Sequence, residues 1–135
     1  MKQVYIINEN HPQLLLFFAA DETPFKQYRP KDMDYMICYD YRTLDFDYSI
    51  FDRYRQVNVV AWSMGVWMGS LILSQVPRDK VFSLAFNGTT YPIDNLEGIP
   101  VKTFRLLSTG LPPQHSRSSC AACVRTATPT RHSWK

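Results

Sequence analysis

The chain has 135 residues, of which 45% are hydrophobic and 14% aromatic, enough for the packed core of one small domain. No stretch is long and apolar enough to span a bilayer, and the N-terminus lacks the pattern of a signal peptide. Three cysteines do not make a disulfide framework. We therefore expect a cytoplasmic protein rather than a membrane-spanning or disulfide-stapled one.

Charge is distributed unevenly along the sequence. The formal net charge is +3, but all 12 acidic residues lie within residues 1–101, whereas residues 102–135 are basic and contain no acid. A basic tail is able to bind nucleic acid or an acidic partner. Its six basic residues are spread thinly, however, so we expect no nucleic-acid partner.

The first part of the chain predicts two strands, over residues 4–7 and 14–19, which are expected to pair as a hairpin. The second is a continuous apolar run, typical of a strand covered on both faces. Thr23 and Pro24 favour the start of a short helix that runs to about Tyr28.

A second central strand is predicted over residues 35–41, and Cys38 within it is interpreted as a small buried hydrophobe. Ser49 is expected to cap a short helix over residues 50–55. The following run over residues 56–61 is rich in β-branched residues and predicts another strand.

The sequence Ala61-Trp62-Ser63-Met64-Gly65 follows that strand and precedes an apolar helix-like run. Strand, sharp turn and helix with a serine at the apex are typical of the nucleophile elbow, normally G-x-S-x-G, here with Ala61 in place of the first glycine. Ala61 and Gly65 are small because neighbouring backbone crowds those positions. Ser63 is the candidate nucleophile, and the Met64 N–H, at the helix start, is the candidate oxyanion donor.

The remaining elements continue the alternation of strands and helices. A helix is expected over residues 64–76, ended by Pro77, and a strand over residues 81–86, followed by a turn at Asn87. Residues 91–100 are irregular. The pattern predicts an α/β fold with a mostly parallel sheet flanked by helices, in which ligands bind at the carboxyl ends of the strands.

The run VVAWSMGVW, residues 59–67, resembles the elbow of the BioG-type pimeloyl-[acyl-carrier-protein] methyl ester esterases, small α/β-hydrolases of biotin synthesis. Three further stretches resemble that family in the same order: LLLFFA at residues 14–19, ICYDY at residues 37–41, and the segment from NGT at residues 87–89 to GIP at residues 98–100. The resemblance covers about residues 3–104. It implies a serine carboxylesterase that uses no cofactor, whose partner is an acyl-carrier protein bearing a pimeloyl methyl ester.

The resemblance also marks where this chain departs from the family. The loop after residue 19 is expected to supply a second oxyanion amide, but the family's Gly-Trp-Gly segment is missing here, and Ala20 is the best candidate. The acid and histidine of the family's catalytic triad come much later in its sequences. None of Asp79, Asp94, Glu97, His115 or His132 matches them.

Residues 105–135 are rich in Ser, Thr, Arg and Pro and show no regular period, which predicts an unstructured basic tail after a partial hydrolase domain over residues 1–104. Our hypothesis is that the reading frame is lost near residue 104, and translation of the other frames tests it. A zinc site at His115, Cys120, Cys123 and His132 is the weaker interpretation, because no knuckle turn accompanies these residues; we expect no metal.

Two functions from different classes follow from these observations. The first is a serine carboxylesterase that is impaired because its base and acid are missing. The alternative is a non-catalytic α/β module that binds an acyl carrier or another partner. Hydrolysis of a short p-nitrophenyl ester that disappears in Ser63→Ala distinguishes the two.

Overall fold

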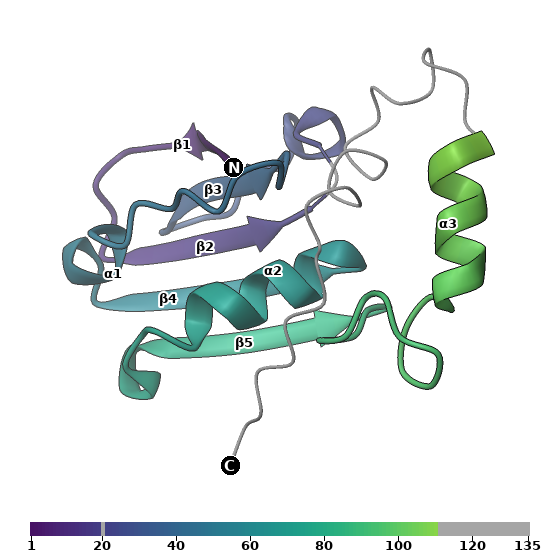
Figure 1. Ribbon diagram of the computed structural model, residues 1–135. Helices are drawn as coiled ribbons and strands as arrows, with labels where there is room; N and C mark the ends of the chain where they lie inside the picture. Colours follow the sequence, from purple (N-terminus) through teal and green to yellow (C-terminus); the bar gives the residue numbers. More distant parts are fainter. Residues whose placement is uncertain (20, 111–135) are drawn as a thin grey trace.

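A computed structural model of the protein describes residues 1–19 and 21–110. A five-stranded mixed sheet carries the fold, with the strand order β1-β3-β2-β4-β5 (Figure 1). The strands are β1 (Lys2–Ile7), β2 (Gln13–Phe18), β3 (Asp34–Tyr39), β4 (Gln56–Trp62) and β5 (Val81–Phe86). The helices are α1 (Ile50–Arg53), α2 (Met64–Leu73) and α3 (Val101–Gly110), and short 3₁₀ turns cover Thr23–Phe25 and Arg78–Lys80.

The expected hairpin between the first two strands is wrong. β1 pairs antiparallel with β3, whereas β2 lies between β3 and β4 and is parallel to both. The apolar run of β2 explains this, because a strand without a polar face is best buried at the centre of a parallel sheet. The connection between β1 and β2 is held against the start of β3, because the amides of Glu9 and His11 donate to the carboxylate of Asp34.

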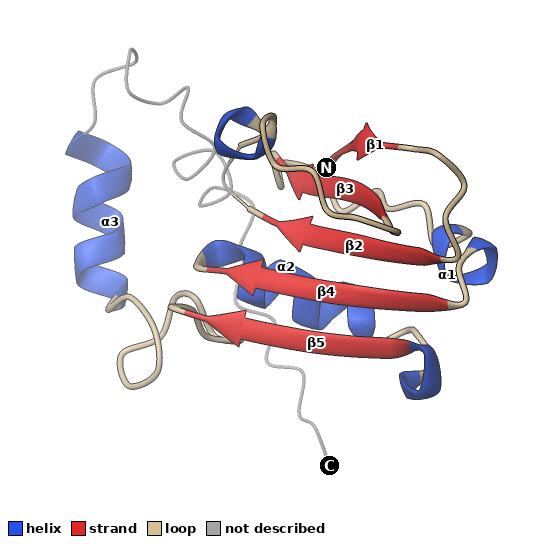
Figure 2. Ribbon diagram, turned by 180° about the vertical axis from the view of Figure 1, so that it is seen from behind, coloured by secondary structure: helices blue, strands red, loops and turns tan. Residues whose placement is uncertain are grey.

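The core lies on both faces of the sheet. On the face covered by α2, Leu14, Leu16 and Phe18 of β2 pack in one cluster with β4 and the helix. On the opposite face, a smaller cluster forms around Tyr35 and Ile37 of β3. Figure 2 shows α2 behind β4 and β5, so that face is turned away from the viewer. Cys38 is a free, fully buried thiol in the first cluster, as predicted.

Three predicted helices are shorter than expected. The segment after Thr23 forms one 3₁₀ turn, over Thr23–Phe25. Helix α1 ends at Arg53, and the hydroxyl of Ser49 binds the Asp47 carboxylate instead of capping the helix. Helix α2 ends at Leu73, and the chain then tightens into turns before Pro77, which disfavours helical backbone in the residue before it.

Helix α3 corrects the predicted boundary between domain and tail. It spans Val101–Gly110, so residues 105–110 are helical rather than unstructured. Both views place it beyond the carboxyl ends of the parallel strands and not over a face of the sheet (Figures 1 and 2). The rest of the predicted tail, residues 111–135, lies outside the described residues. None of the described helices is long and apolar enough to cross a membrane.

Candidate active site

A pocket lies where β4 and β5 end. Its volume is about 310 Å³, and the turn after β4 and the loop after β5 supply its walls. The lining residues are Ser63, Met64, Asn87, Gly88, Thr89, Pro92, Glu97, Gly98 and Ile99. The carboxyl ends of parallel strands are where α/β sheets bind ligands, so the pocket occupies the expected edge of the sheet.

Ser63 joins β4 directly to α2 in a conformation that L-residues rarely adopt. Its φ is 55° and its ψ is −123°. A residue held there costs on the order of 1–3 kcal/mol, which the surrounding contacts must offset. Two of these contacts are hydrogen bonds: the Ser63 N–H donates to Phe86 O over 3.3 Å, and Ser63 O accepts from the Val66 N–H over 3.0 Å. The side chain remains exposed at the mouth of the pocket.

Gly65 has to be a glycine for steric reasons. A Cβ at this position would lie 2.4 Å from Phe18 O, a backbone atom of the neighbouring strand. Ala61 is buried in β4 and pairs with Phe18 on one side and Ala85 on the other. The first turn of α2 is therefore pressed against the end of β2, and small residues on both sides of Ser63 allow that close approach.

Of the two predicted oxyanion donors, Met64 lies within the described residues and Ala20 does not. Met64 is the first residue of α2 and lines the pocket beside Ser63. The first N–H groups of a helix lack intrahelical partners and carry the positive end of its dipole, which suits a developing negative charge. Ala20 lies outside the described residues. Its neighbour Ala19 is buried, and the Ala19 N–H donates to Cys38 O over 3.0 Å.

The loop after β5 holds the Ser63 turn from the other side. Asn87 has a left-handed φ of 51° and directs the chain back toward α2. A Cβ on Gly88 would lie 2.3 Å from Ser63 O and 2.6 Å from Val66 Cγ2. Sequence reasoning identified the turn at Asn87 but not the role of Gly88, because a glycine after Asn is also the ordinary signal of a surface turn.

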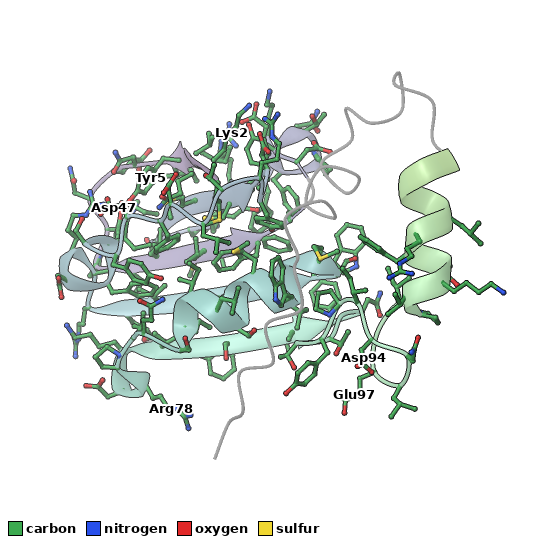
Figure 3. All side chains as sticks on the ribbon, viewed as in Figure 1. Lys2, Tyr5, Asp47, Arg78, Asp94 and Glu97 are labelled. Atoms are coloured by element: carbon green, nitrogen blue, oxygen red, sulfur yellow. The ribbon has the colours of Figure 1, made fainter. Side chains whose placement is uncertain are left out.

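Glu97 is an exposed residue of the loop that lines the pocket, and sequence reasoning left this residue without a role. It lies on the same loop as Asp94 (Figure 3). The carboxylate of Asp94 accepts from the amides of Leu96 and Glu97 over 2.8 and 3.0 Å. Asp94 therefore shapes the turn that presents Glu97. Asp79 lies in the 3₁₀ turn before β5, at the other end of that strand.

The one histidine that the structure describes is far from Ser63 along the strands. His11 precedes β2, and its Nδ1 lies 3.0 Å from Oδ1 of Asp34, the first residue of β3. Asp34 is fully buried and also accepts from the hydroxyl of Tyr54 over 2.7 Å. Burial alone would raise the pKa of Asp34, but the hydrogen bonds from Tyr54 and from the Glu9 and His11 amides hold it below its usual value.

Within the described residues, no three His, Cys, Asp or Glu side chains gather in a way that would hold a metal ion. The four residues of the weaker zinc interpretation, His115, Cys120, Cys123 and His132, all lie outside that part of the chain.

The strand order and the site define an α/β protein with a largely parallel sheet and a serine at the strand–helix turn. A family model described as "Pimeloyl-ACP methyl esterase BioG" matches residues 1–120. The chain belongs to the BioG family. The match extends past residue 104, where the sequence resemblance was expected to end.

Three matches show what the chain is similar to. It is 48% identical over 95 residues to a malonyl-[acyl-carrier protein] O-methyltransferase of Bacteroides fragilis, and 38% identical over 96 residues to an uncharacterized protein of Haemophilus influenzae. The crystal structure of BioG from Haemophilus influenzae superposes with a TM-score of 0.72 at 31% identity and covers 85% of this chain.

The chain matches only part of each relative. The aligned residues make up 68% of this chain but 19% of the Bacteroides fragilis protein and 43% of the Haemophilus influenzae one. The match covers 54% of the crystallised BioG chain. The name of the Bacteroides fragilis relative thus describes a protein of which about a fifth aligns with this chain.

Proposed function

We propose that this chain carries the nucleophile of a serine carboxylesterase of the α/β-hydrolase type, with residues 61–65 as its nucleophile elbow. One observation carries the proposal: Ser63 lies at the strand–helix turn with a φ of 55° and opens into a pocket. Strain of this kind persists where the surrounding structure fixes it, and it is concentrated at functional sites.

The proposed reaction begins with attack of Ser63 Oγ on the ester carbonyl. The Met64 N–H stabilises the negative charge on the carbonyl oxygen, and the loop at Ala20 is the proposed source of a second amide. The alkoxide leaves with a proton as the alcohol, which gives an acyl-serine. Water then attacks the acyl group, which releases the carboxylic acid and regenerates the free serine.

The general base is the weak point of this reaction. Serine needs a neighbouring base, usually histidine, to lose its proton. His11 lies at the opposite, amino end of the parallel strands and is bound to Asp34. The other two histidines of the sequence, His115 and His132, lie outside the described residues. We therefore expect slow acylation, with at most the residual rate that an oxyanion hole and binding supply.

The proposed substrate is the methyl ester of a pimeloyl group on an acyl-carrier protein. The family's description names pimeloyl-ACP, and the name of the Bacteroides fragilis relative names malonyl-[acyl-carrier protein]. The carrier is thus common to both names, whereas the acyl group differs. This supports the carrier protein as the partner more strongly than it supports the pimeloyl chain.

Covalent labelling tests the proposal without requiring turnover. We expect a fluorophosphonate to label the intact chain at Ser63, located by peptide mass spectrometry, and short p-nitrophenyl esters to be hydrolysed slowly. Ser63→Ala should abolish both signals. Ser83→Ala, which removes another exposed serine, should leave them unchanged. Labelling that persists in Ser63→Ala, or no labelling of a folded wild-type chain, contradicts the proposal.

A second candidate, a non-catalytic module that binds an acyl carrier, is favoured by the placement of His11 away from Ser63. It predicts that Ser63→Ala binds an acyl-carrier protein as tightly as the wild type does. The acidic balance of residues 1–101 weighs against it, since such carriers are themselves acidic and favour a basic surface.

A further inference from the structure

Tyr41 is a buried tyrosine whose hydroxyl binds the chain at the end of β2. Its side chain is 2% exposed and packs in the same apolar cluster as Phe18 and α2. A buried tyrosine hydroxyl needs a hydrogen-bond partner. Here it donates to Ala19 O over 2.8 Å, and Cys38 O lies 3.1 Å from the same hydroxyl. A phenylalanine would fill the same apolar space, so what the hydroxyl adds is the bond to Ala19.

Ala19 follows β2 directly and is held through both of its backbone groups. Its N–H donates to Cys38 O over 3.0 Å, and its carbonyl accepts from Tyr41. Both partners belong to the end of β3 and the turn after it. Because Ala19 is buried, its carbonyl needs a donor from within the protein. The carboxyl end of β2 is therefore fixed by residues that come from the neighbouring strand.

The turn after β3 brings Tyr41 back toward β2. Asp40 follows β3 directly and has a left-handed φ of 57°, a conformation that aspartate adopts more readily than most residues. Its carboxylate accepts from the guanidinium of Arg42 and lies 4.0 Å from Nζ of Lys2 on β1. These contacts hold the backbone of the turn that carries Tyr41.

The end of β2 is also the surface on which α2 begins, at the carboxyl edge of the sheet (Figure 1). Gly65 approaches the Phe18 peptide so closely that a Cβ would lie 2.4 Å from Phe18 O and 2.8 Å from its carbonyl carbon. One turn further along, a Cβ on Gly69 would lie 3.4 Å from Cδ2 of the Phe18 ring. Such close packing transmits displacement, so the position of the Phe18 peptide sets the position of the first turn of α2.

A hydrogen bond, a peptide and a steric contact thus connect Tyr41 to the Ser63 turn. The connection runs from the Tyr41 hydroxyl to Ala19, through the adjoining Phe18 peptide, to Gly65. Gly65 lies two residues after Ser63, in the first turn of α2. Contacts of this kind couple two positions only if a change at one of them is felt at the other, which is a measurable property.

We propose that Tyr41 is a positioning residue for Ser63. Its hydroxyl holds the end of β2, and β2 holds the first turn of α2, so that the Ser63 hydroxyl and the Met64 N–H keep their relative positions. A small displacement costs reaction rate more than binding, because only the transition state needs both groups in place. The catalytic meaning of this inference rests on the proposed function, whereas the physical link from Tyr41 to the turn does not.

Tyr41→Phe removes the hydroxyl and keeps the ring. Fluorophosphonate labelling of Ser63 at several reagent concentrations separates the reagent's binding constant from the limiting rate of the covalent step. We expect the limiting rate to fall by about tenfold and the binding constant to change by less than about twofold. Tyr48→Phe is the matched control. Its hydroxyl accepts from Nε2 of Gln75 over 2.8 Å, beyond the far end of α2, so both constants should keep their wild-type values.

Amide hydrogen exchange tests the physical link without any chemistry at Ser63. The Ala19 N–H reports on the end of β2, and the Val66 N–H, which donates to Ser63 O, reports on the turn. In Tyr41→Phe both amides should exchange faster by about tenfold, whereas Tyr48→Phe should change neither. In the wild-type chain, low concentrations of urea should open the two amides together, and this measurement decides the link even where Tyr41→Phe does not fold.

Three outcomes overturn the proposal. In the first, Ala19 exchanges faster in Tyr41→Phe but Val66 does not, or the two amides of the wild type open separately in urea. In the second, Ser63 is labelled in the wild type and its limiting rate is unchanged in Tyr41→Phe. In the third, Tyr48→Phe slows labelling equally. The proposed function fails by a different result, a folded wild-type chain without label at Ser63, and the exchange of the two amides then still decides whether Tyr41 holds the turn.

Discussion

The two ends of the parallel strands differ in how they hold their polar side chains, which are buried and hydrogen-bonded at one end and exposed at the other. At the amino ends, the Asp34 carboxylate is fully buried and accepts from Tyr54, from the His11 ring and from two backbone amides. At the carboxyl ends, Ser63 is exposed in a strained turn beside a pocket. The acid–histidine contact expected of a hydrolase is present, but at the end of the sheet away from the serine.

This contrast separates structural from chemical use of the same residue types. A buried carboxylate with its hydrogen bonds satisfied organises the chain around it, here by holding the ends of β1, β3 and α1 together. A side chain kept exposed at a rigid turn remains free to react. Predictions that treat the two ends independently therefore test whether the division holds.

Asp34→Ala should have the largest effect on stability. It leaves the Tyr54 hydroxyl and the Glu9 and His11 amides without their acceptor, and each unsatisfied buried group costs about 1–3 kcal/mol. We expect the free energy of unfolding to fall by about 3 kcal/mol, measured by urea denaturation. Asp45→Ala, at an exposed loop carboxylate, should change it by less than about 0.5 kcal/mol.

Asp34→Ala also tests whether the amino and carboxyl ends of the strands are independent. Under conditions where Asp34→Ala is still folded, fluorophosphonate should label its Ser63 at the wild-type rate. A large loss of labelling in the folded variant would show that the amino-end cluster also supports the chemistry, and the contrast between the two ends would then be wrong.

The glycines of α2 provide a sharper test at the carboxyl end. In Gly65→Ala the new Cβ would lie 2.4 Å from Phe18 O, so backbone must move, at a cost of about 2 kcal/mol. In Gly69→Ala the nearest atom is Phe18 Cδ2 at 3.4 Å, an ordinary contact. That variant should be neutral or more stable by up to about 1 kcal/mol, since alanine favours helix. Urea denaturation of both variants measures the difference.

The sequence predicted the strands and the Ser63 turn well because both depend on local patterns. The runs of β2, β3 and β5 are predominantly apolar, and the residues around Ser63 have sterically fixed sizes. The pairing of β1 with β3 was not predictable in this way, because it depends on where Asp34 binds the β1–β2 connection. The role of Gly88 likewise rests on contacts between residues far apart in the chain.

Gly88→Ala should lower both the reactivity of Ser63 and the stability of the chain. The added methyl group would meet Ser63 O at 2.3 Å and Cγ2 of the buried Val66 at 2.6 Å, so it would push on the turn and on the core beside it. We expect labelling of Ser63 to slow by about tenfold, because a small misplacement of a reacting group costs that much or more. The matched control is Thr90→Ala, two residues along the same loop and exposed. Equal rates in the two variants would remove Gly88 from the site.

The smallest expected effect is a change in the pH dependence of stability. Hydrogen bonds from Tyr54 and the backbone hold the pKa of Asp34 below its usual value, although burial opposes them. The native carboxyl therefore binds its proton at a lower pH than the unfolded one, so its stabilisation is complete above the unfolded pKa of about 3.9 and is lost as the pH falls through the native pKa. One such group contributes a slope of at most about 1.4 kcal/mol per pH unit.

Asp34→Asn should therefore flatten the acid limb of the stability curve between about pH 5 and pH 3, while lowering stability at pH 7. Asp45→Asn, which changes an exposed carboxylate, should keep the wild-type slope. Urea denaturation at several pH values gives both slopes. An unchanged slope in Asp34→Asn would mean that the buried carboxylate titrates alike in the folded and unfolded chains. The amino-end cluster would then hold the fold through its neutral hydrogen bonds and not through its charge.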